Sequence, residues 1–440
     1  MPKTINHKLT IKNVDVNNKT VLVRVDYDVS VGKYYKIGAT YRIDRTISTL
    51  NFLIKRGCRV IICSHLGRPK NGPENQFSLK RVALYLSSKL KRPVQFIEDP
   101  FSASAKKIVK NLQPGDVAMI ENLRFWPGEE ANDKAFAKKL VTLSGADFFV
   151  QDAFAVLQRK HASMDAITKY LPTVAGLLVV DEYKHLENLL QESPRPTLSI
   201  VGGAKIKDKL TAIDNLIDKC DEFLVGGAVA NTIYRFNELY IGGSLIDESC
   251  REIANDIKVK IKAKEAAMGL DRKNLPRCRV RHSGQCLLCS QTFRIFWDVA
   301  VSVNKKPTQN RMTIESTMVA DNEMILDIGD VAIMRMPMWV GKAKTIVWSG
   351  VIGYVELPYF SEGTKALTRY LAELTSAGKA KVYVGGGDTA DFLYKFYDDP
   401  MQHFEYISTG GSAFLDLLAG KDLPGYDNIL EKPVGADKKP

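Results

Sequence analysis

Long apolar runs are missing from this sequence. No uninterrupted apolar stretch reaches the ~18 residues of a membrane span, and the first residues lack the apolar core of a secretory signal. The last residues carry no peroxisomal Ser-Lys-Leu signal. These absences argue against a membrane-spanning or secreted protein and predict a soluble protein of the cytoplasm.

Regularly spaced cysteines are missing as well. The seven cysteines are spread over 440 residues with no regular pairing. This pattern favours reduced thiols over a disulfide framework, in agreement with an intracellular location.

The sequence also lacks the patterns of two large ligand-binding classes. The net charge is +12, but the lysines and arginines are dispersed, with no basic stripe interleaved with aromatic residues. We therefore expect no nucleic-acid partner and attribute the charge to small anionic substrates. No Gly-x-Gly-x-x-G opens a helix with an acidic residue ~20 positions later, which disfavours a dinucleotide-dependent dehydrogenase.

What the sequence does contain is four apolar stretches that run directly into paired glycines, at residues 198–205, 223–228, 382–389 and 406–411. Each reads as a buried parallel strand that ends in a loop whose backbone can approach a ligand closely. Glycines that only close strand-to-helix turns are the alternative. The neighbouring Lys205 and Lys209 supply cations for phosphate oxygens, and Asp388, followed by Thr389, supplies a carboxylate for a metal.

Apolar strands alternate with helical patterns through the first half of the chain. We expect strands at residues 21–26, 60–65, 117–121 and 148–152, with helical periods between them. The second half repeats this alternation at its glycine exits. The predicted fold class is α/β, with two doubly wound, parallel-sheet (Rossmann-like) domains joined by a helical hinge.

The helical hinge is assigned to residues 181–191, which are strongly helical and precede two prolines. This predicts an N-terminal domain over residues 1–184 and a C-terminal domain over residues 185–420. A C-terminal tail over residues 421–440 is expected to return to the N-terminal domain.

One segment breaks the pattern. Residues 277–297 show neither a clear period nor turn chemistry and read as an irregular insertion. Cys278, His282, Cys286 and Cys289 within it have the spacing of zinc ligands, so a zinc site is one hypothesis and a surface insertion is the other.

Polar residues follow the strand ends of the first half. They are Asp26 and Asp28, then His65 and Arg68, then Arg124, then Arg159 and His161, with Arg42 at the head of the first helical period. Because the carboxyl ends of parallel strands share one edge of a sheet, we expect these residues to face a common crevice. Several arginines there predict a small, multiply charged anion, although each could instead pair with a local carboxylate.

At these residues the sequence resembles the phosphoglycerate kinase family. The matching segments are residues 24–29, 64–69, 121–125, 202–209, 385–389 and 408–411. They occur in the family's order and span nearly the whole chain. Ser-His-Leu-Gly-Arg-Pro and Gly-Gly-Ala-Lys-x-x-Asp-Lys are long, unusual strings and make the resemblance specific.

The resemblance implies a triose site on the first domain, a nucleotide site on the second, and closure by hinge bending. It implies reversible phosphoryl transfer from 1,3-bisphosphoglycerate to ADP, giving 3-phosphoglycerate and ATP, with Mg²⁺ as cofactor. It also implies a monomer whose partners are these small molecules. Such a transfer needs positioning and charge neutralisation more than a base, because the carboxylate is already a competent nucleophile.

The resemblance carries site residues over to matching positions. The implied triose-binding residues are Asp26, Asp28, Arg42, His65, Arg68, Arg124 and Arg159. The implied nucleotide-binding residues are Gly203, Lys205, Lys209, Gly226, Gly227, Ser349, Glu356, Gly385, Gly386, Gly387, Asp388 and Thr389, of which Asp388 would bind the metal. Arg42, Lys205 and backbone N–H groups near Gly386 and Gly410 would stabilise the group in transfer.

Several positions depart from the family's pattern. Asp28 replaces an asparagine, and its carboxylate is expected to repel an anionic triose. Gln158 replaces a histidine, which changes a neutral contact. Ser349 and Val351 replace an asparagine and a proline, and this loss predicts a looser hinge or a looser nucleotide loop. Ala228 and Ser412 replace third glycines, and any of these positions that needs a positive φ would be strained.

The departures motivate an alternative function. A degenerate paralogue would bind nucleotide or triose with weak or no turnover. Normal turnover would dismiss this alternative, and nucleotide binding without turnover would support it.

Overall fold

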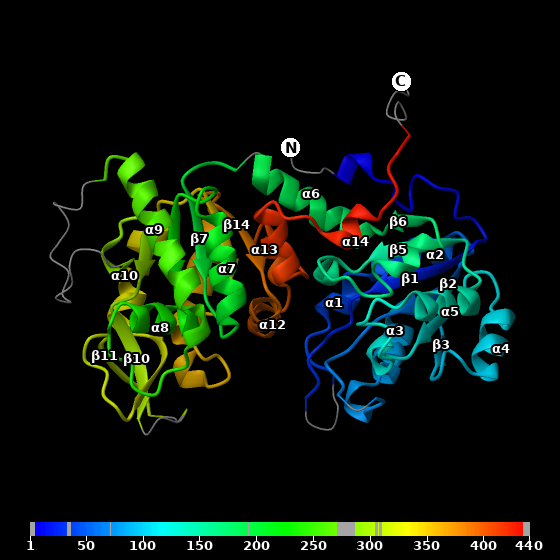
Figure 1. Ribbon diagram of the computed structural model, residues 1–440, viewed down its shortest axis with the longest axis horizontal. Helices are drawn as coiled ribbons and strands as arrows, with labels where there is room; N and C mark the ends of the chain where they lie inside the picture. Colours follow the sequence, from blue (N-terminus) through cyan, green and yellow to red (C-terminus); the bar gives the residue numbers. More distant parts are fainter. Residues whose placement is uncertain are drawn as a thin grey trace. The chain divides into compact units, whose positions relative to one another are not determined.

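The computed structural model describes residues 5–32, 37–70, 72–191, 193–270, 287–303, 307 and 310–433, and it divides the chain into two compact units (Figure 1). Unit 1 comprises Met1–Leu189 with Gly420–Pro440, and unit 2 comprises Leu190–Ala419. The division between residues 189 and 190 falls inside α6, five residues after the predicted one. Within the described ranges, no helix is both long and apolar enough to cross a membrane.

Unit 1 is built on a six-stranded sheet in the order β3-β4-β2-β1-β5-β6, with all neighbours parallel. Its strands are β1 (Thr20–Val25), β2 (Arg59–Cys63), β3 (Val94–Ile97), β4 (Val117–Ile120), β5 (Phe148–Asp152) and β6 (Thr173–Ala175). Its helices are α1 (Tyr41–Asp44), α2 (Ile47–Lys55), α3 (Lys80–Leu90), α4 (Ala103–Asn111), α5 (Lys134–Ser144), α6 (Leu177–Gln191) and α14 (Pro424–Asp427). The sequence pattern missed β3 and β6.

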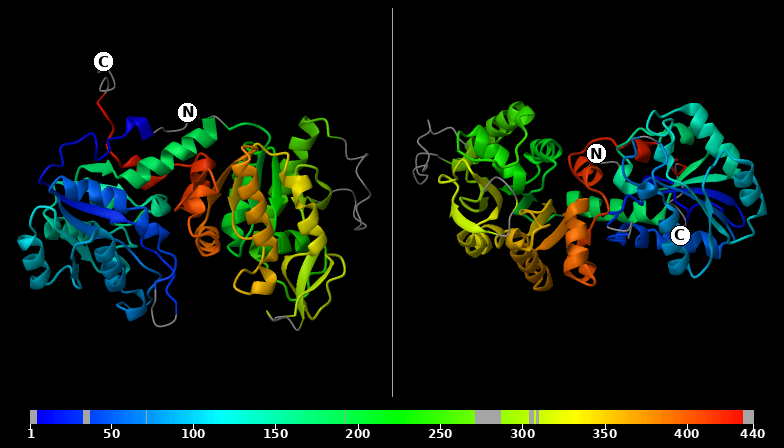
Figure 2. Two further views of the ribbon diagram at one scale, coloured as in Figure 1. Left: turned by 180° about the vertical axis from the view of Figure 1, so that it is seen from behind. Right: turned by 90° about the horizontal axis from the view of Figure 1, so that it is seen from below.

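Helices cover both faces of this sheet, which explains why its strands are mostly apolar. Alternate residues of β1, such as Val21 and Val23, pack against α2 and α3, whereas Leu22 between them packs against α4 and α5. Figure 2 shows the helices on the two sides. The result is two separate apolar layers with the sheet between them.

The C-terminal segment packs within unit 1. The ring of Tyr426 in α14 stacks on Tyr183 of α6 with 4.0 Å between centroids, and Figure 1 shows the two helices side by side. The N–H of Leu9 donates to the carbonyl of Leu430, and the ammonium of Lys8 donates to the carbonyl of Ile429.

Unit 2 has a second six-stranded sheet in the order β15-β14-β13-β7-β8-β9, again with parallel neighbours, and a separate antiparallel sheet in the order β11-β10-β12. Its strands are β7 (Thr197–Val201), β8 (Glu222–Val225), β9 (Phe293–Ile295), β10 (Asp298–Val303), β11 (Met312–Glu315), β12 (Glu323–Ile328), β13 (Thr345–Ser349), β14 (Lys381–Gly385) and β15 (Tyr406–Ile407). Its helices are α7 (Ile206–Leu216), α8 (Gly227–Phe236), α9 (Arg251–Ala267), α10 (Asp330–Val340), α11 (Glu362–Ser376), α12 (Gly387–Phe396) and α13 (Ser412–Leu418). The two parallel sheets confirm the predicted α/β class.

The expectation of a wholly irregular segment at residues 277–297 is wrong at its end. There β9 pairs in parallel with β8, and the side chains of Phe293 and Ile295 are buried. The strand was missed because it is only three residues long and has no period to read. The hypothetical zinc ligands Cys278, His282 and Cys286, and the side chain of Cys289, lie outside the described residues.

Asp152 joins the end of β5 to the start of α6. Its Oδ1 atom accepts the N–H groups of Leu178 and Val179 at 2.9 and 3.3 Å, in the first turn of the helix. Burial raises the pKa of this carboxyl to about 7, although those hydrogen bonds oppose the shift. Folding therefore takes up a proton at Asp152 between pH 4 and 7, and its contribution to stability declines as the pH rises through that window.

Replacing Asp152 by asparagine should flatten this pH dependence, since asparagine keeps an acceptor oxygen but carries no charge. Between pH 5 and 8 the wild type should lose on the order of 2 kcal/mol of unfolding free energy relative to the variant. Urea denaturation at the two pH values measures the difference. The exposed Asp15→Asn is the control, and parallel pH profiles for wild type and Asp152→Asn would contradict the prediction.

Candidate functional site

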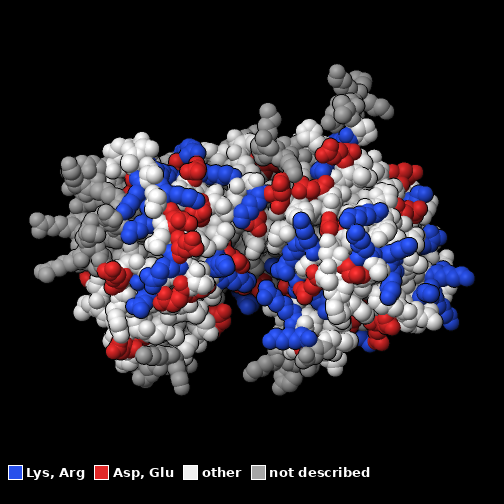
Figure 3. Space-filling view, viewed as in Figure 1, with Lys and Arg blue, Asp and Glu red and all other residues white. Residues whose placement is uncertain are grey.

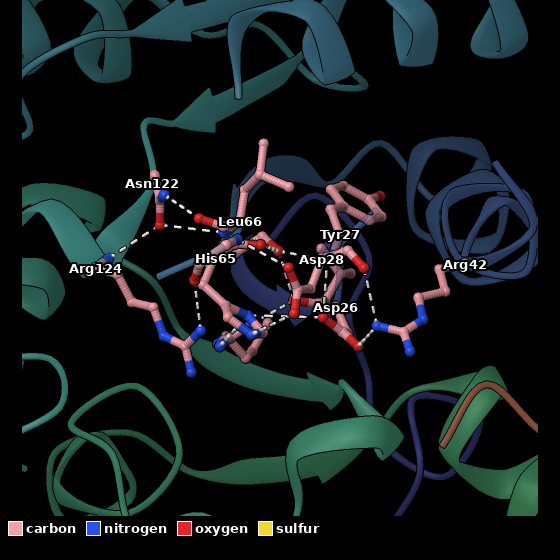
Figure 4. Close-up of polar contacts among 12 residues, drawn as sticks. Asp26, Tyr27, Asp28, Arg42, His65, Leu66, Asn122 and Arg124 are labelled. Atoms are coloured by element: carbon pink, nitrogen blue, oxygen red, sulfur yellow. Dashed lines mark hydrogen bonds and ion pairs between the residues drawn. The ribbon is translucent and has the colours of Figure 1, made fainter. Parts of the chain in front are cut away.

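In unit 1, polar loops meet at the carboxyl edge of the sheet (Figure 4). β1 ends at Val25, β2 at Cys63 and β4 at Ile120, and each is followed at once by polar residues. β2 and β5 lie on opposite sides of β1, so the chain order reverses at β1, the position where parallel sheets commonly bind ligands. The residues predicted to share a crevice therefore leave the same sheet edge.

Arg42 is held at this edge by the loop after β1. Its Nη1 atom donates to Asp26 Oδ2 and to the carbonyl of Asp28, both at 3.0 Å. Asp26 Oδ1 accepts the N–H of Asp28 at 3.1 Å. Asp26 thus orients both the arginine and its own loop.

His65 lies at the same edge with 2 % of its surface exposed. Burial lowers its pKa well below the usual value, and the positive charges of Arg24, Arg124, Arg159 and Arg42 lower it further. The imidazole is therefore neutral at physiological pH.

Two arginines keep buried N–H groups unpaired. Arg124 donates from Nη1 to the carbonyl of Gly67 at 2.7 Å and pairs through Nε with Glu130 at 3.0 Å, but its buried Nη2 has no hydrogen-bond partner among the described residues. The buried Nε of Arg159 is in the same situation. Buried donors without partners are costly, and a small anion would satisfy them.

The other predicted triose residues differ in their surroundings. Arg68 is exposed. Asp28 accepts the N–H of Gly67 at 2.8 Å through Oδ1, and its Oδ2 lies 4.0 Å from His65 Nε2. Gln158 has a buried Oε1 atom without a hydrogen-bond partner in the described part of the chain. Asp28 thus keeps the loop contact that an asparagine oxygen could also make.

Unit 2 contains a cavity of about 310 Å³ beside the exits of β7, β8 and β13. Five predicted nucleotide residues line it, namely Gly203, Gly226, Gly227, Glu356 and Asp388. The sequence pattern missed its apolar walls, which include Tyr234, Phe296, Val299 and Ile352. The sequence gives no local pattern for these residues, because each looks like an ordinary core residue. Only the fold brings them together around one cavity.

The paired glycines let three strand exits pack against one another. A Cβ on Gly350 would lie 2.0 Å from the carbonyl oxygen of Gly202, and one on Gly227 would lie 2.8 Å from the nitrogen of Gly203. Gly203 and Gly227 also have positive φ, at +93° and +61°. Both interpretations of the glycines, as turn residues and as residues that bring the backbone close to a ligand, therefore apply. The same glycines close the turns and expose backbone to the cavity.

The lysines beside these loops lie in different environments. Lys209 Nζ donates to Ser349 Oγ at 2.6 Å, and burial, followed by the charge of Lys205, lowers its pKa to about 8. The side chains of Lys205 and Asp388 are exposed and pair at 3.5 Å. A half-buried lysine and an exposed carboxylate near one cavity are groups that phosphate and a divalent cation would engage.

The last two glycine exits also lie together. The N–H of Gly386 donates to the carbonyl of Gly410 at 3.1 Å, and the N–H of Gly410 donates to Ser408 Oγ at 3.0 Å. In this conformation these two N–H groups are engaged within the chain. The first-turn N–H groups of α12, which begins at Gly387, have no acceptors within the helix, so a helix start can offer them to an anion.

Ala228 and Ser412 would be strained only at a positive φ, and this condition is not met. Both residues lie in helices, Ala228 in α8 and Ser412 at the start of α13, and neither has a positive φ. Each follows the glycines that make the turn, so a side chain fits the helical backbone without strain.

The loop after β13, where Val351 replaces the family's proline, is restrained by hydrogen bonds. The N–H of Gly350 donates to Thr389 Oγ1 at 2.8 Å, and the N–H groups of Ile352 and Gly353 donate to Thr364 Oγ1 at 3.2 Å. The side chain of Val351 is 8 % exposed. These contacts restrain the loop without a proline.

Basic residues do not form a single stripe on the face in Figure 3, where blue and red side chains are intermixed on both units. The concentrated positive charge is instead the set of arginines around His65 in unit 1. Arginines gathered around His65 in one parallel-sheet unit and a glycine-lined cavity beside a half-buried lysine in the other are features of a two-domain α/β enzyme that acts on phosphorylated ligands.

Comparison with known proteins identifies the family. The family model for phosphoglycerate kinase matches residues 11–421. A phosphoglycerate kinase of Francisella philomiragia is 39% identical over 428 residues, covering 96% of this chain and 98% of that protein. A chloroplastic phosphoglycerate kinase of Volvox carteri is 37% identical over 95% of this chain and 84% of its own length.

Solved structures agree. Phosphoglycerate kinase from Coxiella burnetii superposes with a TM-score of 0.71 at 33% identity, covering 96% of this chain and 98% of that one. The enzyme from Pyrococcus horikoshii gives 0.77 at 26% identity with the same coverage. This chain belongs to the phosphoglycerate kinase family, which confirms the resemblance seen in its signature segments.

Proposed function

We propose that this chain catalyses reversible phosphoryl transfer from 1,3-bisphosphoglycerate to ADP, giving 3-phosphoglycerate and ATP in glycolysis and gluconeogenesis. The observation that carries the proposal is the set of buried, unpaired N–H groups of Arg124 and Arg159 beside neutral His65 and oriented Arg42. This set is suited to a carboxylate, a hydroxyl and a phosphate on a small molecule.

The nucleotide side of the reaction belongs to the cavity in unit 2. Gly203, Gly226 and Gly227 would admit the flat base, Glu356 would accept the ribose hydroxyls, and Lys209 would pair with phosphate oxygens. Mg²⁺ bound to the nucleotide would be held by Asp388, and it supplies positive charge to the phosphate oxygens. One protein carboxylate together with phosphate groups is an arrangement that magnesium favours, so the residues fit the ion.

The residues of this chain would position the substrates and neutralise their negative charge. They would not exchange protons with the substrate. Arg42 and Lys205 would bear on the charge of the transferring group, with the helix start at Gly387 as a further donor set. Since no base is needed, neutral His65 serves as a hydrogen-bond donor.

A coupled spectrophotometric assay tests the proposal. ATP should form when 1,3-bisphosphoglycerate, ADP and Mg²⁺ are supplied together, and no ATP should form when any one is omitted. Binding of ADP by calorimetry without turnover would instead support the alternative of a degenerate paralogue. The bacterial relatives support a cytoplasmic enzyme and the family supports a monomer, which cell fractionation and light scattering would check.

Replacing Asp28 by asparagine should improve triose binding. The amide oxygen of the new side chain can still accept the Gly67 N–H, while the negative charge near the bound anion disappears. We expect the KM for 3-phosphoglycerate to fall about fivefold, with little change in melting temperature. Steady-state kinetics in the ATP-consuming direction measures it, with Asp44→Asn as a carboxylate control on α1. An unchanged or higher KM would show that the carboxylate does not repel the substrate.

The two ligand sites lie on different units, so transfer requires them to meet. We expect closure about the α6 hinge to be driven by the two ligands together. Small-angle X-ray scattering should then give a smaller radius of gyration with 3-phosphoglycerate and a non-hydrolysable ATP analogue together than with either alone. Identical profiles in all states would refute ligand-driven closure.

A further inference from the structure

A fully buried ion pair underlies the triose site and has no part in the function proposed above. Arg24 of β1 and Glu129, which follows β4, are both 0 % exposed, and Arg24 Nη2 lies 3.9 Å from Glu129 Oε1. Buried ion pairs are seldom more stabilising than apolar residues of the same size, because both charges lose their hydration. A structural purpose alone therefore explains this pair poorly.

The Arg24 guanidinium is fixed from two sides. Its Nε donates to Ser163 Oγ at 2.8 Å, and its Nη1 donates to the carbonyl of Val25. Ser163 is itself fixed, because its N–H and hydroxyl donate to the Glu129 carboxylate at 3.0 and 2.6 Å. Because the guanidinium cannot rotate, its remaining nitrogen, Nη2, is held in one position.

That Nη2 atom lies 3.2 Å from Nδ1 of His65. A guanidinium has only donors, so Nδ1 must be the acceptor and carry no proton. Asp26 Oδ1 would favour a proton on Nδ1, but it is farther away, at 3.6 Å, and already accepts the N–H of Asp28. The proton of the neutral ring therefore belongs on Nε2.

The other side of the ring agrees with this assignment. Nε2 faces Oδ2 of Asp28 at 4.0 Å, too far for a hydrogen bond but an acceptor rather than a donor. Burial and the nearby positive charges of Arg24, Arg42, Arg124 and Arg159 hold the pKa of His65 well below its usual value.

We propose that Arg24, held by Glu129 and Ser163, is a positioning residue that fixes His65 as the neutral Nε2–H tautomer and presents a defined hydrogen-bond donor to the anion site. The arginines of the site are charged at every physiological pH, and a neutral, fixed donor adds direction without adding a group that titrates. The tautomer assignment stands on geometry alone, and only its effect on triose binding rests on the proposed function.

The wild-type protein supplies the first test. Two-bond ¹H–¹⁵N correlation spectra of protein labelled at its six histidines report which ring nitrogens carry protons, and His65→Gln assigns the signals. We expect an unprotonated Nδ1 and a protonated Nε2, unchanged from pH 6 to pH 8. A protonated Nδ1, or an imidazolium spectrum in this range, would overturn the proposal.

A paired variant supplies the second test. Removing Arg24 alone would leave Glu129 buried without a charge partner, so Arg24→Gln and Glu129→Gln are combined. The amide of the new side chain can accept as well as donate, and His65 should then show both tautomers. The KM for 3-phosphoglycerate should rise about tenfold, as expected for a misdirected hydrogen bond to a charged group, with a smaller change in kcat.

Arg59→Gln on β2 is the matched control, since its guanidinium donates to the carbonyl of Leu112 and does not contact His65. It should leave the His65 spectrum unchanged. A folded double variant that keeps a single Nε2–H tautomer would overturn the role of Arg24. If the double variant does not fold, the wild-type spectrum alone decides whether His65 is the Nε2–H tautomer. An inactive wild type with the expected spectrum would contradict the proposed function and leave this inference standing.

Discussion

Replacing Arg42 by alanine should reduce kcat by about 10³-fold, the loss typical of an arginine that neutralises a phosphoryl group in transfer. Arg42 Nη1 binds both Asp26 Oδ2 and the carbonyl of Asp28, so the guanidinium is already aimed before substrate arrives. Its removal deletes a cation and takes away the ion-pair partner of the Asp26 carboxylate, whose side chain is 5 % exposed in the wild type. Coupled-assay kinetics with saturating substrates measures the change.

Arg56→Ala is the control for Arg42→Ala. Arg56 follows α2, is exposed and stacks over Phe52, so its loss should leave kcat within about twofold of the wild type. Circular dichroism should show that both variants are folded. If Arg42→Ala kept more than a tenth of wild-type kcat, Arg42 would not be the group that neutralises the transferring phosphoryl.

Replacing Lys209 by methionine should raise the KM for ADP by about 10²-fold, because a charge-assisted hydrogen bond to phosphate is lost while the apolar stem is kept. In the wild type, burial lowers the pKa of Lys209 to about 8. The ammonium is present below that pH and is lost above it. The kcat/KM for ADP should therefore decline as the pH rises through 8.

Lys207→Met is the control for Lys209→Met, because it tests whether loss of any lysine on this turn would raise the KM for ADP. Lys207 is exposed in the first turn of α7, two residues before Lys209, and its loss should change neither the KM for ADP nor the pH profile. The Lys209→Met enzyme should lack the decline above pH 8. A decline that persists in Lys209→Met would have to come from another group.

The family, the fold class and the sheet edge shared by several predicted site residues could be read from the sequence, for different reasons. The buried parallel strands were legible because burial on both faces makes them continuously apolar, as at residues 117–120. Asp26, His65 and Arg124 could be grouped because strand ends in a parallel sheet share one edge. Their individual roles in catalysis remain predictions.

Other features could not be read along the chain. β9 is too short to show a period, and the antiparallel sheet around β10 follows a segment without turn chemistry. Whether Ala228 and Ser412 need a positive φ could not be read along the chain, and only the backbone conformation shows that neither does. Phe296 and Tyr234 reach the cavity wall from separate elements, so no spacing connects them.

The sequence by itself determined the α/β class, the family and the chemical types of residue at each strand end, because these depend on local pattern and on strings of neighbouring residues. Only the tertiary structure decided which groups meet. Arg24 and His65 are 41 positions apart, and Lys209 and Ser349 are 140 apart. Such contacts also set protonation, because burial, which only the fold creates, is the largest cause of the lowered pKa of both His65 and Lys209.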